Sequence, residues 1–188
     1  MRQTRLNAKG SETLGESKLD LGPHLSIAPF FPISREVAVK MLSLAGLCSD
    51  DLVCDLGCGT GEILVTAAQN FGAKAVGVEL DRRLYKKAMY RIRKRQLDDR
   101  VKVIHNDLFR FNLGDADVVT LYLTDDANAK VKPKLDWELK KGAKVVSHDF
   151  KVPGWMPSKI EFIDKRLRLM SPEGILYLYR YPQCQNSY

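Results

Sequence analysis

The feature that most constrains the fold of this chain is the alternation of short apolar runs with segments of helical spacing. Five apolar runs have the length of β-strands, at residues 52–56, 75–79, 101–105, 117–123 and 144–148. Strands separated by helices form parallel βαβ units, with helices on both faces of the sheet. Two further strand-like runs, 159–166 and 174–181, are predicted to pair as an antiparallel hairpin at the edge. The predicted fold class is therefore α/β, a single doubly wound domain with a mostly parallel, seven-stranded sheet.

Capping and turn residues predict where the helices begin and end. Ser34 is a typical N-cap for the first helix, and Asp81 is one for the helix after the second strand. Gly72 suits the C-terminal end of the helix between the first two strands. Pro133 suits the first turn of a helix that would run to Lys141, between the fourth and fifth strands. Each of these helices thus has a boundary signal of its own.

Length and composition limit the class of protein. The chain has 188 residues, which we divide into a polar tail at 1–22, predicted to be disordered, and one folded domain at 23–188. No run approaches the ~18 consecutive apolar residues of a membrane span, and the N-terminus lacks the apolar block of a secretory signal. We therefore expect a cytoplasmic protein without a membrane segment. The four cysteines form no CxxC pair, so neither a disulfide nor a metal site is predicted.

The charge of the chain is positive and unevenly distributed. The formal net charge is +7, and residues 82–96 carry eight basic side chains without an acidic one. Such a balance favours acidic or nucleic-acid partners, whereas a basic helix is more often a solvated face. Whether this helix contacts a partner is left open at this point, as is the oligomeric state.

A glycine-rich loop follows the first predicted strand, at the position where α/β folds bind nucleotides. Its residues Asp55, Gly57, Gly59 and Gly61 form the pattern D-x-G-x-G-x-G. Dinucleotide sites use G-x-G-x-x-G and hold a pyrophosphate, whereas here the third glycine comes one residue early. The carboxylate of Asp55 would repel a pyrophosphate but attract a ligand with an ammonium and a sulfonium group. S-adenosylmethionine has both charges and no phosphate, so it is the predicted cofactor.

Two acidic residues follow the next two strands. Glu79 ends the second strand, where a carboxylate can accept hydrogen bonds from both ribose hydroxyls. Asp107 follows the third strand and is placed to accept from the adenine amino group, while the amide of Leu108 can donate to a ring nitrogen. The alternatives are a surface glutamate that begins a loop and, at Asp107, a cap of a helix or turn. Since the carboxyl ends of parallel strands meet at one edge, we expect these residues to share one crevice with the glycine loop.

The glycine pattern resembles the first motif of class I methyltransferases. On that resemblance Gly57 and Gly59 let the backbone approach the methionine part of the cofactor, and Asp55 helps to hold its amino group. In these enzymes the segment after the fourth strand faces the transferred methyl group, so Tyr122 and Thr124 are the predicted catalytic residues. Alternatively, Tyr122 packs in the sheet, and Thr124 or its neighbour caps the next turn. The Asn/Asp-Pro-Pro-Tyr tetrapeptide of adenine-N6 and glutamine methyltransferases is absent.

Several longer motifs lie along the chain: Pro29-Phe-Phe-Pro-Ile-Ser34, Lys132-Pro-Lys-Leu135, Glu138-Leu-Lys-Lys-Gly142, Lys144-Val-Val-Ser-His-Asp-Phe150, Pro153-Gly-Trp155 and Leu176-Tyr-Leu-Tyr-Arg180. Together they resemble the small archaeal protein-lysine methyltransferases and their mitochondrial relatives, over roughly residues 27–181. The resemblance implies a Rossmann-like domain that methylates lysine side chains. It also implies that the partners are protein substrates with accessible lysines.

The same resemblance implies where the acceptor binds. Phe30 and Phe31 would wall the methyl site, and Ser34 would belong to the same channel. The family reads Pro-Thr or Pro-Ser in this segment, whereas this chain inserts Ile33 before the serine. As an alternative, the two phenylalanines staple the N-terminal segment to the core. His148, at the end of a predicted buried strand, is expected to be hydrogen-bonded locally rather than to act as a base.

Two other functions remain as alternatives to lysine methylation. An RNA methyltransferase is suggested by the net charge of +7, and a non-catalytic cofactor-binding protein would retain the same motifs.

Free lysine has a pKa of about 10.4, and an apolar channel beside a sulfonium would lower this pKa without a dedicated base. No catalytic base is therefore predicted.

Overall fold

A computed structural model of the chain describes residues 26–167 and 173–182, so the tail predicted at residues 1–22 lies outside the described residues. The helices are α1 (Arg35–Leu44), α2 (Glu62–Phe71), α3 (Arg82–Lys94) and α4 (Asp125–Glu138). The strands are β1 (Leu52–Leu56), β2 (Lys74–Glu79), β3 (Val101–His105), β4 (Val118–Leu121), β5 (Lys144–His148), β6 (Lys159–Phe162) and β7 (Ile175–Arg180). Two short 3-10 helices, η1 (Leu108–Arg110) and η2 (Lys165–Leu167), complete the described elements.

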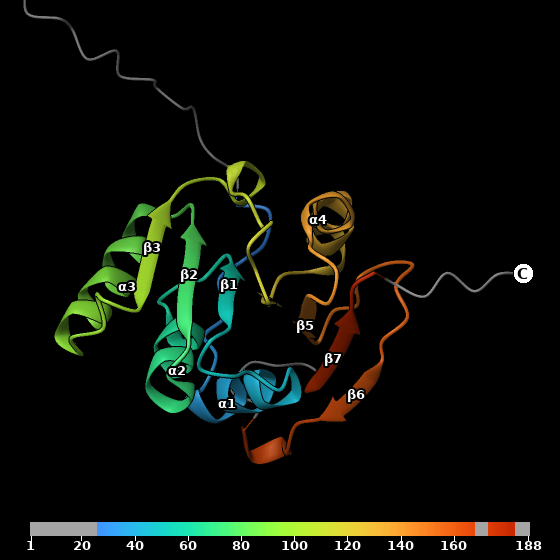
Figure 1. Cartoon of the computed structure of the whole chain (residues 1–188), viewed down its shortest axis with the longest axis horizontal. Helices are drawn as coiled ribbons and strands as arrows, with labels where there is room; N and C mark the ends of the chain where they lie inside the picture. Colours follow the sequence, from blue (N-terminus) through green and yellow to red (C-terminus); the bar gives the residue numbers. More distant parts are fainter. Residues whose placement is uncertain (1–25, 168–172, 183–188) are drawn as a thin grey trace, which may run out of the picture.

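The seven strands form one sheet in the order β3-β2-β1-β4-β5-β7-β6 (Figure 1). The first five are parallel, and Leu56 of β1 pairs with Val78 of β2 on one side and with Leu121 of β4 on the other. β7 is antiparallel to both β5 and β6, so the predicted hairpin is present with β6 at the edge. The predicted doubly wound, mostly parallel sheet is thus confirmed. The strand order reverses between β1 and β4, and such a reversal opens a crevice outside the carboxyl ends of the strands.

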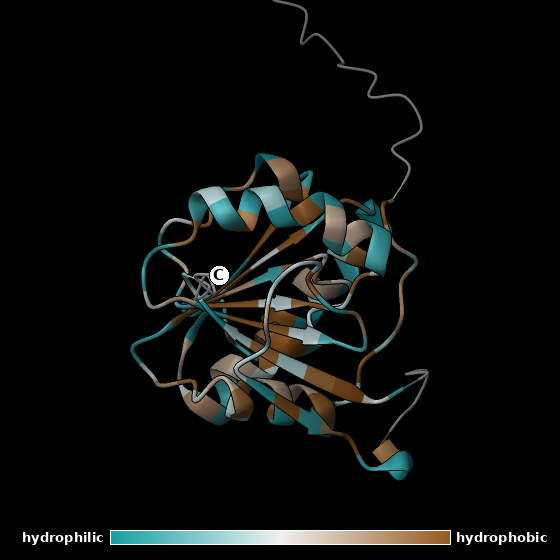
Figure 2. Ribbon diagram, turned by 90° about the vertical axis from the view of Figure 1, so that its right-hand side faces the viewer, coloured by the Kyte–Doolittle hydropathy of each residue, from teal (hydrophilic) through white to brown (hydrophobic). Residues whose placement is uncertain are grey.

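Each face of the sheet is covered by helices over its own apolar cluster. On one face α1, α2 and α3 contribute fully buried side chains such as Met41, Leu64 and Ile92. On the other face α4 contributes Val131 and Leu135. Figure 2 shows the largely hydrophobic strands in the middle, with helices above and below them. Because burial of each large apolar side chain contributes roughly 1.5–3 kcal/mol, these two clusters hold the strand ends in place.

Side chains and glycines mark the helix ends as predicted in three places. The Oγ of Ser34 accepts a hydrogen bond from the backbone N–H of Val37 at 3.3 Å at the start of α1. The carboxylate of Asp81 accepts from the backbone N–H of Leu84 at 3.1 Å at the start of α3. Gly72 ends α2 in the left-handed conformation, with a φ of 68°. The predicted boundaries at these residues are confirmed.

The helix after the fourth strand begins at Asp125, eight residues before Pro133 and therefore earlier than a helix with this proline in its first turn. It starts at Asp125, because the Oγ1 of Thr124 accepts a backbone N–H of the first turn and caps the helix. Pro133, expected in the first turn, lies inside α4, and the helix ends at Glu138 rather than at Lys141. The apolar residues 127, 131 and 135 recur every four positions and are buried. Their burial against the sheet outweighs the proline as a boundary signal.

Three strands, β4, β6 and β7, are shorter than predicted, and the difference at β4 matters for the site. β4 ends at Leu121, so Tyr122 and Leu123 belong to the segment that leaves the sheet. β6 ends at Phe162, short of the predicted residue 166.

In the described ranges, no helix combines the length and the apolar character that a membrane crossing requires.

Candidate active site

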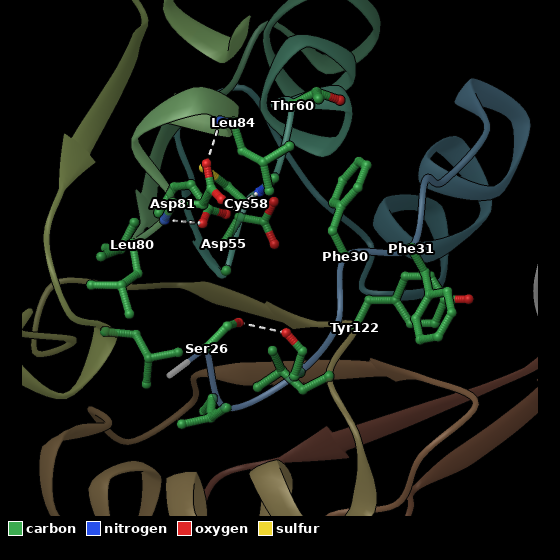
Figure 3. Close-up of a pocket in the computed structure, with 18 of the residues that line it drawn as sticks. Ser26, Phe30, Phe31, Asp55, Cys58, Thr60, Leu80, Asp81, Leu84 and Tyr122 are labelled. Carbon is green, nitrogen blue, oxygen red and sulfur yellow. Dashed lines mark hydrogen bonds between the residues drawn. The ribbon is translucent and has the colours of Figure 1, made fainter. Parts of the chain in front are cut away.

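A cavity of about 430 Å³ opens at the carboxyl ends of β1 to β4, where the strand order reverses. Small-molecule sites in proteins have volumes of about 300–1,000 Å³, so a ligand of nucleoside size fits here. We call residues 26–33 the strap, because this segment walls one side of the cavity (Figure 3). The rest of the lining comes from the glycine loop, the end of β2, the segment after β3 and the segment after β4, at residues 55, 57–60, 62–63, 78–81, 84, 106–109 and 122–123.

Most of the predicted site residues line this one cavity. They are Asp55, Gly57, Gly59, Glu79, Asp107, Leu108, Phe30, Phe31 and Tyr122. Three predicted residues are absent from the lining, and each occupies a helix cap instead. Gly61 is the N-cap of α2, whereas Ser34 and Thr124 direct their hydroxyls to the first turns of α1 and α4. In this structure the hydroxyls of Ser34 and Thr124 therefore serve as helix caps, and the substrate contact of Ser34 and the catalytic role of Thr124 stay predictions.

Backbone hydrogen bonds fix the glycine loop to the end of β2. The N–H groups of Gly57 and Cys58 both donate to the carbonyl of Val78 at 3.0 Å. The N–H of Gly59 donates to the Oε2 of Glu79 at 2.7 Å. The loop therefore has its shape before a ligand binds, which reduces the conformational entropy that binding would remove.

Gly77 was not predicted as a site residue, yet the loop depends on it. A Cβ at this position of β2 would lie 2.6 Å from the Sγ of Cys58 and 2.5 Å from the Cδ1 of Leu64. Both separations are shorter than van der Waals contact, so the loop and α2 approach β2 this closely only over a glycine. A glycine inside an apolar strand marks such an approach, and this was the available sequence signal.

The strap places an aromatic ring directly on the glycine loop. A Cβ on Gly59, which has a φ of 54°, would lie 2.5 Å from the Cε2 of Phe30. On the other side of the strap, Figure 3 shows the rings of Phe31 and Tyr122 together. Their ring centroids are 6.1 Å apart. The labelled aromatic rings thus lie on the opposite side of the cavity from Asp55 (Figure 3).

Asp55 is a buried carboxylate with a single hydroxyl partner. It is 4% exposed, and its Oδ1 accepts a hydrogen bond from the Oγ1 of Thr120 at 2.8 Å. No lysine or arginine within the described ranges forms an ion pair with it. The pKa of Asp55 is raised to about 7, chiefly by burial; the hydrogen bond from the Thr120 hydroxyl opposes this shift, and the nearby Glu79 carboxylate adds to it. A cationic ligand would supply the missing positive charge.

This pKa makes cofactor binding depend on pH. A cation that binds beside Asp55 lowers its pKa below the value of about 7 in the free protein, so binding releases a proton near neutrality. Affinity for S-adenosylmethionine should therefore fall as the pH falls below about 7, by about tenfold between pH 8 and pH 6. Calorimetry at a series of pH values checks this. The Asp55→Asn variant, which cannot titrate there, should show a flat profile, and a flat profile for the wild type would contradict the assignment.

Glu79 and Asp107 both reach the cavity, but they differ in burial and in their bonds. Glu79 is buried, and besides Gly59 it holds the N–H of Asp81 through Oε1 at 2.8 Å. Asp107 is half-buried, and its Oδ1 accepts the N–H of Phe109 at 3.0 Å. The cap considered as an alternative for Asp107 is therefore present, on a residue that also lines the cavity. Each carboxylate oxygen can accept a further hydrogen bond from a ligand.

Tyr122 joins the cavity to the end of β5. Its ring centroid lies 4.1 Å from that of His148, in a tilted stack. Burial raises the pKa of Tyr122 to about 12, so its hydroxyl is protonated at neutral pH and is no base there. Local hydrogen bonding, expected for His148, is not found: both ring nitrogens are buried without a hydrogen-bond partner. That expectation was wrong.

The chemistry of the cavity fits S-adenosylmethionine better than a phosphate ligand. Two carboxylates, Asp55 and Glu79, are buried on one side, and aromatic rings form the other side. Buried carboxylates repel phosphates and attract cations. The part of the chain that the structure describes contains no group of three histidine, cysteine, aspartate or glutamate side chains that could hold a metal ion.

Comparisons with known proteins identify the family. The family model of the ANTKMT methyltransferase domain matches residues 55–159, which is more than half of the chain. The chain belongs to this methyltransferase family. A protein-lysine N-methyltransferase of Saccharolobus islandicus is 40% identical over 139 residues, which make up 73% of this methyltransferase and 84% of that protein. The human lysine N-methyltransferase of the ATP synthase C-subunit is 29% identical over 135 residues, or 70% of this chain and 56% of the human protein.

A solved structure is similar over nearly its whole length. It is an RNA methyltransferase from Salinibacter ruber in complex with S-adenosyl-L-homocysteine, with a TM-score of 0.76 and 34% identity. The match covers 84% of this methyltransferase and 98% of that chain. The bound demethylated cofactor agrees with the prediction of S-adenosylmethionine. The names of these relatives differ on the acceptor, which is a protein lysine in two of them and RNA in the third.

Proposed function

We propose that this methyltransferase transfers the methyl group of S-adenosylmethionine to the side-chain amine of lysine residues in proteins. The observation that carries the proposal is the division of the cavity into an acidic side and an aromatic side. The acidic side suits the cationic donor, and the aromatic side suits an acceptor that must lose its own charge. The 40% identity to a protein-lysine N-methyltransferase over most of both chains supports this acceptor.

In this proposal the carboxylates bind the cofactor. Asp55 receives the amino group of the methionine part, because it is buried beside the glycine loop without a cation of its own. Glu79 accepts from the ribose hydroxyls, and Asp107, with the amide of Leu108, holds the adenine. Gly59 makes room for the ring of Phe30 on the loop, beside the proposed cofactor.

The aromatic side of the cavity binds the acceptor amine. The cofactor supplies a methyl carbon on a positively charged sulfur, and the amine forms the N–C bond as the S–C electron pair returns to sulfur and a proton leaves to solvent. Neutralising a free lysine near pH 7 costs roughly 4–5 kcal/mol. Phe31 and Tyr122 remove water from the amine and offer it no carboxylate, so they favour its uncharged form.

Two observations favour RNA as the alternative acceptor: the name of the Salinibacter relative and the basic surface of α3. A base taken from a strand would need a stacking partner together with hydrogen bonds to its edge. Phe31 and Tyr122 are tilted by 38° to each other and offer no parallel slot for a planar base. A flexible aliphatic chain fits such a wall better, and lysine is therefore the acceptor we propose.

Peptides with one potential acceptor each test the proposal. With labelled S-adenosylmethionine, a peptide library with a single lysine per member should be methylated. Matched libraries with arginine, glutamine or norleucine at that position should not. The rate should rise from about pH 7 to about pH 9, because the fraction of neutral amine rises. Label in the arginine or glutamine library would contradict lysine as the acceptor.

The cytoplasmic location of the enzyme stays a prediction.

The exposed face of α3 offers a place for acidic or nucleic-acid-bound substrates. A shallow hollow on it is lined by Thr60, Lys86, Lys87, Tyr90, Arg91, Lys94 and Arg95. Thr60 also lines the cofactor cavity, so a substrate held in this hollow would lie close to the site. Arg91 pairs with Glu62, whereas no ion pair within the described ranges involves Lys87, Lys94 or Arg95.

Reversing the charges of Lys87, Lys94 and Arg95 to glutamate should lower the rate on protein–nucleic-acid complexes by about tenfold at low salt. The rate on short free peptides should hardly change. The difference should shrink as salt shortens the Debye length below about 8 Å. Reversal of Lys74, Lys130 and Lys141, exposed residues on other elements, is the matched control. Equal losses in the two triple variants, or equal losses on both substrates, would contradict a docking role of α3.

A further inference from the structure

The end of β5 holds a buried imidazole whose polar atoms have no partner. His148 is 2% exposed, and neither Nδ1 nor Nε2 has a hydrogen-bond partner. Leaving a buried polar group without a hydrogen bond costs about 1–3 kcal/mol, so such a group needs an explanation. Thr66 and Asn128 also hold an unpartnered atom among the described side chains, but only His148 stacks on a residue that lines the cavity.

The surroundings of the imidazole leave one nitrogen free. The Nε2 lies 3.7 Å from the Oδ1 of Asp149, an oxygen that the N–H groups of Gly174 and Ile175 hold in place at 2.7 and 3.0 Å. A carboxylate on that side favours the tautomer with the proton on Nε2. The lone pair of Nδ1 then remains available to a donor.

The position of His148 in the sheet brings it to the acceptor side of the cavity. It ends β5, the neighbour of β4, and Tyr122 follows the end of β4. The rings of Phe31, Tyr122 and His148 form a continuous row, with centroid separations of 6.1 and 4.1 Å. Phe31 and Tyr122 line the cavity and His148 lies directly behind Tyr122, so a chain that enters along Phe31 reaches the imidazole when the ring of Tyr122 moves aside.

We propose that the Nδ1 of His148 accepts a hydrogen bond from the acceptor amine, and that the row Phe31–Tyr122–His148 is the binding site of the acceptor side chain. This inference rests on the proposed function and names the residue that orients its substrate. The hydrogen bond turns the lone pair of the amine toward the methyl carbon, and such orientation of reacting atoms is a large part of catalysis. His148 contacts the substrate but removes no proton.

A neutral imidazole suits this task better than a carboxylate would. Burial lowers the pKa of His148 to about 4, although the Asp149 carboxylate opposes the shift, so the ring is uncharged at neutral pH. A carboxylate in its place would stabilise the ammonium form of the substrate, which has no lone pair to donate. An uncharged acceptor stabilises the ammonium form less than a carboxylate would and therefore raises the pKa of the amine less.

Three variants separate this role from a structural one. His148→Phe keeps an aromatic ring against Tyr122 but removes the acceptor, and we expect kcat on the single-lysine peptides to fall by about 10- to 100-fold. Its affinity for S-adenosylmethionine and its melting temperature should stay near those of the wild type. His148→Asn restores an acceptor close to the position of Nδ1 and should recover part of the lost rate. Thr66→Val is the matched control: it removes the hydroxyl of Thr66 in α2, which is also buried without a hydrogen-bond partner, and it should leave kcat unchanged.

A spectroscopic measurement on the wild-type enzyme gives an independent result. With ¹⁵N-labelled histidine, the Nδ1 resonance of His148 should move when a lysine peptide is added to the complex with S-adenosylhomocysteine. The norleucine peptide should leave it unchanged. An unshifted resonance, a wild-type kcat in His148→Phe, or equal losses in the Phe and Asn variants would overturn the inference. If the wild type methylates no lysine peptide, the proposed function itself is wrong, whereas lysine methylation with a silent His148 removes only the inference.

Discussion

Asp55→Asn should abolish methyl transfer and at the same time stabilise the cofactor-free protein. Asparagine keeps the shape of the side chain and can still accept the hydrogen bond from Thr120. It lacks the negative charge that the cationic cofactor needs, so the affinity for S-adenosylmethionine should fall by about 100-fold or more. Losing a hydrogen-bonded charge partner typically costs about 1.5–3 kcal/mol, and the buried setting puts this site at the upper end.

The gain in stability follows from the raised pKa of Asp55. The pKa is about 7 in the fold against 3.8 for an unburied aspartate, so the folded protein binds this proton more tightly than the unfolded chain. The wild type therefore loses stability as the pH rises from about 4 to about 7, and above about 7 the loss is complete. The asparagine side chain of the variant has no such titration. Near pH 8 we expect Asp55→Asn to raise the free energy of unfolding by about 1–3 kcal/mol.

Thermal unfolding at several pH values checks this prediction. The advantage of Asp55→Asn in melting temperature should be small near pH 4 and largest above about pH 7. Saturating S-adenosylmethionine should reverse the order, because the cofactor binds the wild type more tightly and therefore stabilises it more. A variant that is less stable at every pH, or that still responds to the cofactor like the wild type, would contradict the account of Asp55.

Glu79→Ala should weaken cofactor binding by more than Asp107→Ala. Glu79 is buried, and its carboxylate holds the N–H groups of Gly59 and Asp81 at 2.7 and 2.8 Å. The alanine variant loses the proposed ribose contact and also leaves these two N–H groups without partners, at about 1–3 kcal/mol each. The glycine loop would then lose its fixed shape. We expect a loss in affinity of about 100-fold or more for Glu79→Ala.

Asp107→Ala is the comparison for that experiment. Asp107 is half-buried and caps a single turn of 3-10 helix, so its removal leaves one N–H that water can reach. We expect a loss in affinity of about tenfold, the effect of one hydrogen bond to adenine. Glu79→Gln, which retains one acceptor oxygen, should fall between the two alanine variants. Calorimetry with S-adenosylmethionine gives all three values, and the reverse order of Glu79→Ala and Asp107→Ala would contradict the assigned contacts.

The sheet and the cofactor side of the cavity were predictable from local sequence. Asp55, Glu79 and Asp107 each lie in or directly after an apolar run of strand length, and parallel strands bring such residues to one edge. The glycine spacing then pointed to a cationic ligand. Each of these signals is contained in a few consecutive residues, so it can be recognised without knowledge of packing or of long-range contacts.

The acceptor side depends on contacts between distant segments, and there the sequence was less informative. Thr124 follows the fourth strand as a catalytic residue would, but its hydroxyl caps α4, because the apolar pattern of that helix begins earlier than Pro133 suggested. The residues around His148 in the sequence do not predict an unpartnered imidazole, because Tyr122 contacts this ring only in the folded protein. Gly77 is required by the close packing of Cys58 and Leu64 on β2; a glycine inside an apolar strand signals such an approach but does not show which residues make it.

The chemical identity of the methylated product tests the central claim most directly. The wild-type enzyme, with S-adenosylmethionine labelled in its methyl group, should be incubated with a mixture of cellular protein and RNA, and both fractions then hydrolysed to amino acids and nucleosides. Asp55→Asn serves as the inactive control for contaminating activity. The account predicts that the label is found in Nε-methylated lysine and is absent from nucleosides. Label in methylated nucleosides, with none in lysine, would contradict it and assign the cavity to RNA.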